Sequence, residues 1–384
     1  MASALGNLRI LDFSRVLAGP FATMLLADLG ATVTKIERPG TGDDTRAWGP
    51  PYDEAGEATY FLAVNRNKDS LVLDLADEDG QAHAHRLSLE ADVIVENFRP
   101  GVMDRLGLGY DDLRGENPGL VYCSITGFGR GEGAQLPGYD LLIQALGGLM
   151  SITGEADREP QKVGVALVDI LSGLFSTVGI LAALRHRDET GEGQRVEVNL
   201  LSSLLAALVN QASAYTAGGV VPTRMGNAHP SIAPYELLRT GEGDLVLAVG
   251  TDRQFGALCE VLGASELAED ARFASNPARV EHRAELREEL ERRLASRTAA
   301  EWAAALIDVR VPAGEVNDVA GAFALAEHIG LEPIVRLARE DGTTVPLARN
   351  PIGLSATPPT YRSAPPRLGV AATDRSDASR GSVR

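Results

Sequence analysis

The residue best placed to do chemistry is Asp169, a single carboxylate within the apolar stretch 163–173. The nearest other acids along the chain are Glu159 and Asp188. A charged side chain among Val, Ala, Leu and Ile is costly to bury unless it is paired or hydrogen-bonded. Asp169 therefore has two interpretations: it caps the helix that follows, as Asp often does, or it is a partly desolvated nucleophile or acid/base.

Basic and polar side chains follow two of the expected strands. Arg38 and Arg46 lie in the loop 37–46, and the run 96–101, Glu-Asn-Phe-Arg-Pro-Gly, follows another strand. Ligands of open α/β sheets bind at the carboxyl ends of strands. These loops are candidates for binding an anionic ligand, although a solvated loop with surface ion pairs would have the same composition.

A glycine-rich segment, 126–133, follows a further expected strand at 120–125. Alternate glycines indicate unusual backbone torsions, which suit either a loop that presents N–H groups to a ligand or a flexible turn. The Gly-Lys-Ser/Thr ending of a P-loop is missing, and the first β–α turn, 16–20, has one glycine rather than the dinucleotide-binding fingerprint. We therefore expect neither a P-loop nor an ordinary NAD site.

No metal site is expected from the histidines or cysteines. His83 and His85 are two residues apart on an expected helix and so point to different faces. Cys123 and Cys259 are far apart, and neither belongs to a Cys-x-x-Cys pair, which argues against a zinc knuckle or a disulfide framework. A reduced, cytoplasmic protein is the simplest interpretation.

Charge and hydropathy limit the possible partners. The net charge is −17, and nucleic-acid binding usually needs a basic face, so we expect no nucleic acid. A few local arginines can still hold an anionic small molecule in an acidic protein. No apolar run reaches about 18 residues, and the N-terminus lacks a basic segment followed by an apolar one. We therefore expect no membrane span and no secretory signal.

The scaffold for these residues follows from the expected elements. A strand at 8–13, a helix at 21–29 and a strand at 31–36 form a β–α–β unit, which predicts an α/β domain with parallel strands. Two helices, over 172–185 and 200–214, are largely apolar and must be covered by something. Together they suggest an extensive subunit interface.

The 384 residues predict two domains. The character of the sequence changes around 217–219, and charged helices follow over 280–306. We assign 226–325 to a smaller second domain. From Pro358 the chain is rich in Pro, Ser, Arg and Ala, and we expect the last dozen residues to be disordered.

Seven short motifs occur in one order along the chain. They are Leu-Asp-Phe-Ser-Arg-Val-Leu-Ala-Gly-Pro at 11–20, Val-Thr-Lys-Ile-Glu-Arg-Pro-Gly at 33–40, Glu-Asn-Phe-Arg-Pro-Gly at 96–101, Asp-Arg-Leu-Gly at 104–107, Ser-Ile-Thr-Gly-Phe-Gly at 124–129, Gly-Tyr-Asp at 138–140 and Gly-Val-Ala-Leu-Val-Asp at 164–169. Together they resemble the family III CoA-transferases, the group of formyl-CoA transferase and its relatives, which also includes α-methylacyl-CoA racemase. The resemblance covers most of the chain.

The resemblance implies an interlocked homodimer with an α/β fold. Each chain would have a large Rossmann-like domain, formed by 1–225 and a return segment at 326–362, and a smaller α/β domain at 226–325. From composition, we expect residues 363–384 to form a disordered tail.

The resemblance also implies a catalytic role for Asp169. Further positions match those that contact CoA in the family, namely Leu17, Ala18, Arg38, Leu73, Asn97, Phe98, Arg99, Arg105, Tyr139 and Asp140. Two positions depart from the formyl-CoA transferase pattern: Leu17 stands where that enzyme has Gln, and Pro137 where it has Lys. These departures put side-chain contacts to CoA at positions 17 and 137 in doubt.

The implied reaction passes CoA from an acyl-CoA thioester to a carboxylic acid through aspartyl anhydride and aspartyl-CoA intermediates. It needs no metal or prosthetic group, since the CoA thioester is a substrate. One alternative is an α-methylacyl-CoA racemase or epimerase, but in that branch a His occupies the position of Tyr139, and Tyr, with a pKa near 10, is a poor two-way proton carrier. A second alternative is a non-catalytic CoA-ester-binding homologue, against which an intact Asp169 argues.

The segment 224–235 resembles the branch that moves CoA from succinyl-CoA to dicarboxylates such as glutarate. A dicarboxylate needs a cation for its far carboxylate. Arg46 and Arg224 are the candidates, although either could instead form a surface ion pair.

Overall fold

The computed structural model describes residues 3–369 and divides the chain into two units. The first unit contains Met1–Leu149, Val163–Gly219 and Glu332–Arg384, as far as these are described, and the second contains Met150–Lys162 and Val220–Leu331. Residues 370–384, which include the last dozen residues where we expect disorder, lie outside the described part of the chain.

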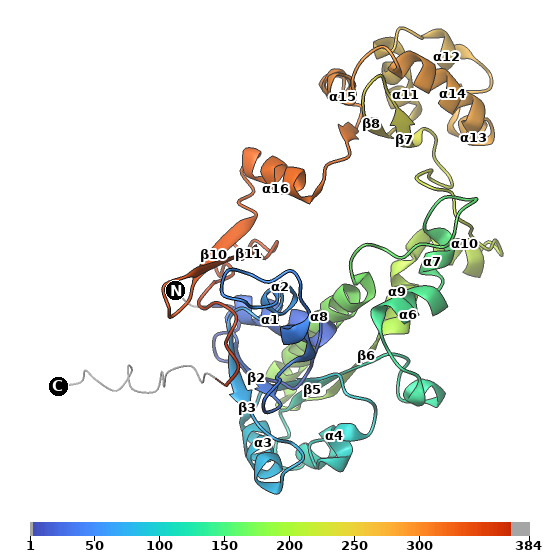
Figure 1. The fold of residues 1–384 in the computed structure, drawn as a ribbon. Coiled ribbons are helices and arrows are strands. Elements are labelled where there is room, and N and C mark those ends of the chain that lie inside the picture. Colours follow the sequence, from blue (N-terminus) through green and yellow to red (C-terminus); the bar gives the residue numbers. More distant parts are fainter. Residues whose placement is uncertain (1–2, 370–384) are drawn as a thin grey trace. The chain divides into compact units, whose positions relative to one another are not determined.

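A six-stranded parallel sheet forms the centre of the first unit (Figure 1). Its strands lie in the order β3-β2-β1-β4-β5-β6. Their bounds are Arg9–Asp12 (β1), Thr32–Glu37 (β2), Lys68–Val72 (β3), Val93–Glu96 (β4), Val121–Thr126 (β5) and Arg195–Asn199 (β6). The prediction of an α/β protein with parallel strands is confirmed. The order reverses between β1 and β4, and this reversal is where ligands of such sheets bind.

Helices pack on both faces of this sheet. Helix α1 and the long helix α8 bury apolar side chains against one face, and α3, α4 and α5 cover the other. The helical segments of the first unit are α1 (Ala18–Asp28), η1 (Asp44–Ala47), α2 (Thr59–Leu62), α3 (Glu78–Glu90), α4 (Val102–Arg105), α5 (Tyr110–Leu113), η2 (Glu132–Gln135), α6 (Asp140–Leu146), α8 (Leu167–Thr190), α9 (Leu200–Ala207) and α10 (Val209–Thr216).

Helix α8 is longer than the sequence indicates, because the apolar residues before Ser172 continue it. Its N-cap is Ala166, so Asp169 lies in the first turn and is not the capping residue. The capping interpretation of Asp169 is therefore wrong. The helix is long and apolar enough to cross a membrane by length and composition alone, but it packs against α1, β5 and β6 as a core helix does.

The helix expected over 200–214 is divided in two. Helix α9 ends at Ala207, and Val209, at the start of α10, has a φ of 42°. This left-handed conformation is unfavourable for a β-branched residue and interrupts the helix.

The second unit has its own antiparallel sheet and its own core, built around Phe255, Leu290 and Trp302. Its elements are β7 (Tyr235–Arg239), β8 (Asp244–Ala248), β9 (Ala313–Glu315), α11 (Asp252–Val261), α12 (Glu266–Glu269), α13 (Asn276–Glu281), α14 (Arg283–Leu294), α15 (Ala299–Asp308) and α16 (Val319–His328); α7 (Leu149–Ile152) lies at the boundary of the two units.

After α16 the chain forms a hairpin of β10 (Ile334–Ala338) and β11 (Thr344–Ala348). Leu337 and Val345 of this hairpin pack with Leu62 of α2. The C-terminal segment is thereby attached to the first unit.

The crossing of α1 and α8 requires Gly173. A Cβ added there would lie 2.7 Å from the carbonyl oxygen of Ala18, a backbone atom that cannot swing aside. We expect Gly173→Ala to lower the free energy of unfolding by about 1–3 kcal/mol, measured by chemical denaturation. Gly256→Ala is the matched control, since the Cβ of this helical glycine meets nothing within 4 Å. A control variant that is destabilised equally would contradict this explanation.

Candidate active site

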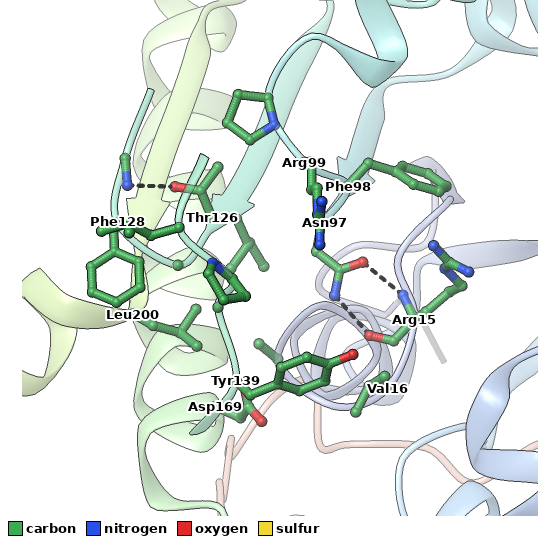
Figure 2. A pocket seen from close by; sticks show the side chains of 18 of the residues that line it. Arg15, Val16, Asn97, Phe98, Arg99, Thr126, Phe128, Tyr139, Asp169 and Leu200 are labelled. Atoms are coloured by element: carbon green, nitrogen blue, oxygen red, sulfur yellow. Dashed lines mark hydrogen bonds between the residues drawn. The ribbon is translucent and has the colours of Figure 1, made fainter. Parts of the chain in front are cut away.

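A cavity of about 230 Å³ lies beyond the carboxyl ends of β1, β4 and β5, and it is the larger of the two that border the residues indicated by the resemblance. Figure 2 shows its lining side chains. Of the residues that the resemblance indicates, this cavity contains Leu17, Ala18, Asn97, Phe98, Arg99, Tyr139 and Asp169.

The smaller cavity, of about 170 Å³, lies beyond the ends of β2 and β3. Arg38 and Leu73 line it. Arg15 and Phe98 line both cavities, and the Arg15 guanidinium lies 4.9 Å from the centre of the Phe98 ring. The two cavities therefore adjoin at this pair and can together hold one extended ligand.

Asp169 contributes a half-buried carboxylate to the larger cavity. Burial, and secondly the negative charge of Asp140, raise its pKa to about 7. Its position in the first turn of α8 opposes this shift, because a helix N-terminus favours a negative charge. Within residues 3–369, the Asp169 carboxylate forms no hydrogen bond or ion pair. This group is therefore available to a substrate.

Asp140 provides the cap that Asp169 does not. Its Oδ1 accepts hydrogen bonds from the N–H of Val168 at 2.8 Å and of Asp169 at 3.4 Å, and its Oδ2 accepts from Gln144 at 2.6 Å. Both oxygens thus hold the chain around the start of α8. The neighbouring Tyr139 side chain is 65 % exposed at the cavity.

Two glycines bring the Tyr139 segment against the loop after β5. A Cβ added to Gly127 would lie 2.6 Å from the Cα of Gly138, so the two backbones touch. Of the glycine-rich segment 126–133, Gly129 has a positive φ, and its N–H donates to the hydroxyl of Thr126. The loop is thereby a fixed wall of the larger cavity.

Asn97 uses its side chain to hold another cavity loop. Its Oδ1 accepts from the N–H of Arg15 at 2.8 Å, and its Nδ2 donates to the Arg15 carbonyl at 2.7 Å (Figure 2). The amide is therefore occupied by the backbone after β1, which joins the loops that follow β1 and β4.

The three arginines of the resemblance are in different settings. Arg38 bonds to Asp44 and Thr41 beside the smaller cavity. Arg99 is exposed at the rim of the larger cavity. Arg105 is exposed on α4 and lines neither cavity.

The two candidate dicarboxylate-binding arginines both have protein partners. Arg46 forms a bidentate ion pair with Glu37, with distances of 2.7 and 2.8 Å, and its guanidinium lies 3.7 Å from the centre of the Phe61 ring. In the second unit, Arg224 donates to the carbonyls of Glu155 and Arg158. Their contact with substrate stays a prediction.

Two site residues escaped the sequence analysis. Arg15 carried a usable signal, since it stands three residues after β1 just as Arg99 stands three after β4. Tyr60 carried none, because it follows no strand, but it is near the carboxylates: burial and the charges of Asp169 and Asp140 raise its pKa. No group of three potential metal ligands occurs within residues 3–369.

Comparison with known proteins identifies the family. The family model described as CoA-transferase family III matches residues 5–371. The chain belongs to CoA-transferase family III. The succinate–glutarate CoA-transferase of Agrobacterium fabrum is 45 % identical over 371 residues, covering 95 % of this chain and 93 % of that protein. The human succinyl-CoA:glutarate CoA-transferase is 41 % identical over 330 residues, covering 85 % and 75 %.

A solved structure supports the same assignment. The crystal structure of a CAIB/BAIF family protein from Brucella suis has a TM-score of 0.85 and 45 % sequence identity, and the match covers 96 % of this chain and 97 % of that one. The fold of this family III CoA-transferase is therefore the CAIB/BAIF fold.

The raised pKa of Asp169 predicts how stability depends on pH. Between its unfolded pKa of 3.8 and its folded pKa of about 7, the folded protein holds a proton that the unfolded chain has lost. Stability should therefore fall as the pH rises through this window. Relative to the wild type, Asp169→Asn should melt at about the same temperature at pH 4 and at least about 2 °C higher at pH 8. Calorimetry at several pH values tests this, and a difference that does not change with pH would contradict it.

Proposed function

We propose that this enzyme transfers CoA from succinyl-CoA to a dicarboxylic acid such as glutarate, with Asp169 as the nucleophile. The observation that carries the proposal is the half-buried Asp169 carboxylate, which faces a cavity at the strand-order reversal without a cationic partner in the described chain. The named activities of the Agrobacterium and human relatives support the choice of donor and acceptor.

The two adjoining cavities suit an extended thioester. We place the nucleotide end of CoA in the smaller cavity, beside Arg38 and Leu73, and its acyl end in the larger one, at Asp169. Arg15, at the junction, and Arg99, at the rim, can then meet phosphate groups, since guanidinium pairs well with phosphate.

The first half of the reaction forms two covalent intermediates. A carboxylate oxygen of Asp169 attacks the thioester carbonyl of the donor, the carbon–sulfur bond breaks, and CoA leaves as a thiolate with an aspartyl–acyl anhydride left behind. The thiolate then attacks the aspartyl carbonyl. The donor acid leaves as a carboxylate, and an aspartyl-CoA thioester remains.

The second half reverses these steps with the acceptor. The acceptor carboxylate attacks the aspartyl carbonyl and displaces the CoA thiolate. The acceptor and Asp169 are then joined in a new anhydride. The thiolate attacks the acceptor's acyl carbon, and Asp169 leaves as a carboxylate. Residues at the start of α1 and in the loop 127–133 line the cavity, and we propose that their backbone N–H groups, other than that of Gly129, stabilise the oxyanions.

The racemase alternative is less well supported. Tyr139 stands where the resemblance places the racemase histidine, and a phenol, whose ordinary pKa is near 10, is a poor two-way proton carrier near neutral pH.

We also propose a homodimer. Helix α16 is largely apolar, yet none of its residues is buried, and Val319 is 76 % exposed. Phe175 and Val178 on α8 are exposed as well. Apolar faces of this kind are normally covered, and a second copy of this chain is the occupant that the family resemblance suggests.

Transfer activity tests the proposed reaction. The pure protein, incubated with succinyl-CoA and a panel of mono- and dicarboxylic acids, should form new CoA esters, detected by mass spectrometry, with dicarboxylates preferred. Asp169→Ala should lose at least about 10³-fold in rate, since it lacks the nucleophile. Exchange of the α-proton of a 2-methylacyl-CoA without transfer would favour the racemase, and CoA-ester binding without either activity would favour a non-catalytic homologue.

The pH–rate profile tests the state of the nucleophile. Because Asp169 must be ionised to attack, kcat/KM should rise with pH to a plateau above about pH 7. Asp140→Asn removes the neighbouring negative charge but keeps an oxygen that can cap α8, so the rise should move to lower pH by up to about one unit. Asp157→Asn, an exposed acid in the second unit, should not move it. Equal profiles for all three proteins would contradict this.

A further inference from the structure

A buried ion pair beneath the loop 14–17 has no role in the steps above. Lys35 on β2 and Asp43 in the following loop have fully buried side chains, and Nζ and Oδ2 are 2.8 Å apart. Burying two charges costs free energy that their mutual attraction seldom returns in full, so such a pair is weak evidence of a stabilising role. The contribution of this pair is then better sought in the backbone groups that it holds in place.

Both members of the pair bind the backbone of the loop 14–17. Lys35 Nζ donates to the carbonyl of Ser14 at 2.8 Å. Asp43 accepts from the N–H of Val16 at 3.3 Å and from the N–H and hydroxyl of Thr45. The two backbone contacts therefore lie on either side of residue 15.

Val16 needs such support, because it has a φ of 70°. This left-handed conformation is unfavourable for a β-branched side chain, whereas glycine adopts it without steric cost. Its side chain also packs in an apolar cluster with Leu17 and Tyr60. The hydrogen bond from its N–H to Asp43 is positioned to keep the strained conformation.

The charges of the pair persist at neutral pH. Burial opposes the charge of Lys35, but Asp12 and Asp43 outweigh it and hold the pKa of Lys35 above its usual range. Burial likewise opposes the charge of Asp43, but Lys35 and the hydrogen bonds from Thr45 keep its pKa below its usual range. Both residues are therefore charged at neutral pH, and we call this ion pair of Lys35 and Asp43 the clamp.

We propose that Lys35 and Asp43 are positioning residues that hold Val16 in its left-handed conformation and thereby aim Arg15 at the junction of the two cavities, where it meets the phosphates of CoA. The proposal rests on the proposed function, because it requires CoA to occupy those cavities. Arg15 lines both cavities, and its guanidinium lies over the Phe98 ring. Its one ion pair among the described residues is weak, with 3.7 Å between Nη1 and Oδ2 of Asp44.

Binding of CoA to the full chain tests the proposal, measured by isothermal titration calorimetry. The variant Lys35→Met with Asp43→Asn removes both charges together and leaves an amide oxygen near Val16. We expect its Kd for CoA to rise about tenfold or more, since preorganisation is lost. The KM for succinyl-CoA should rise in parallel, with the KM for the acceptor acid unchanged.

A second buried pair provides the matched control. Arg66 Nη2 and Asp28 Oδ2 are 2.7 Å apart, both residues are buried in the same unit, and, unlike Lys35 and Asp43, which line the smaller cavity, they line neither cavity. The glycine rescue below therefore decides between lost positioning and a lost direct contact at the cavity wall. The variant Arg66→Met with Asp28→Asn should lower Tm but keep the Kd for CoA within about twofold, because effects at distant sites are independent. If the control weakens CoA binding as much as the Lys35 and Asp43 variant does, the positioning role is wrong.

Substitution of Val16 by glycine distinguishes a positioning role of the clamp from a general loss of structure. Val16→Gly in the wild type measures the loss of the valine side chain itself. Added to the Lys35→Met, Asp43→Asn variant, it should recover at least about half of the lost affinity on a logarithmic scale, because glycine accepts the φ of 70° without the clamp. An equal effect of Val16→Gly in both backgrounds would overturn the proposal.

Two controls keep the outcomes distinct. If the double variant does not fold, Asp43→Asn alone, which keeps Lys35 and most of the hydrogen bonds, replaces it. Its effect on the Kd for CoA should again be partly reversed by Val16→Gly, although both effects should be smaller. Additive effects of the two substitutions on the Kd would overturn the proposal. A wild-type protein that does not bind CoA would overturn the proposed function instead.

Discussion

The candidate site depends on the reversal of strand order between β1 and β4. The helix after β1 packs on one face of the sheet and the helices after β4 on the other, so the two loops separate and leave a crevice at the strand ends. Both cavities border these loops. Asn97 joins the loops across the crevice by bonding both polar groups of the Arg15 backbone. A ligand bound there would touch both halves of the sheet.

The close crossing of α1 and α8 completes the site. Gly173 lets the backbone of Ala18 approach α8, and this contact places the first turn of α8, with Asp169, beside the start of α1. The same enclosure removes water from the carboxylate and raises its pKa to about 7. A carboxylate that is costly to the fold thus lies where the proposed chemistry needs it, which is the usual conflict between stability and function.

Buried charged side chains lie beneath the loops that border the two cavities, as well as within these loops. Asp12, at the end of β1, bonds to Lys68 at 3.0 Å, and both side chains are fully buried. Lys68 also donates to the carbonyl of Pro20 and to Asn65, so each of its donors has an acceptor. Satisfied networks of this kind rigidify their surroundings. This network holds the backbone beneath the loops that follow β1, β2 and β3, where we propose that the ligand binds.

The sequence by itself determined the fold class, the family and the carboxylate on which the proposed chemistry rests. Hydrophobic periodicity, turn residues and ordered motifs are local properties of the chain, so they can be identified without coordinates. Only the tertiary structure showed that Asp140 caps α8, that Asn97 bonds to the backbone 82 residues earlier, and that Arg46 and Arg224 have protein partners. Which acceptor a donor meets depends on contacts between distant segments, and these are decided by packing rather than by local sequence.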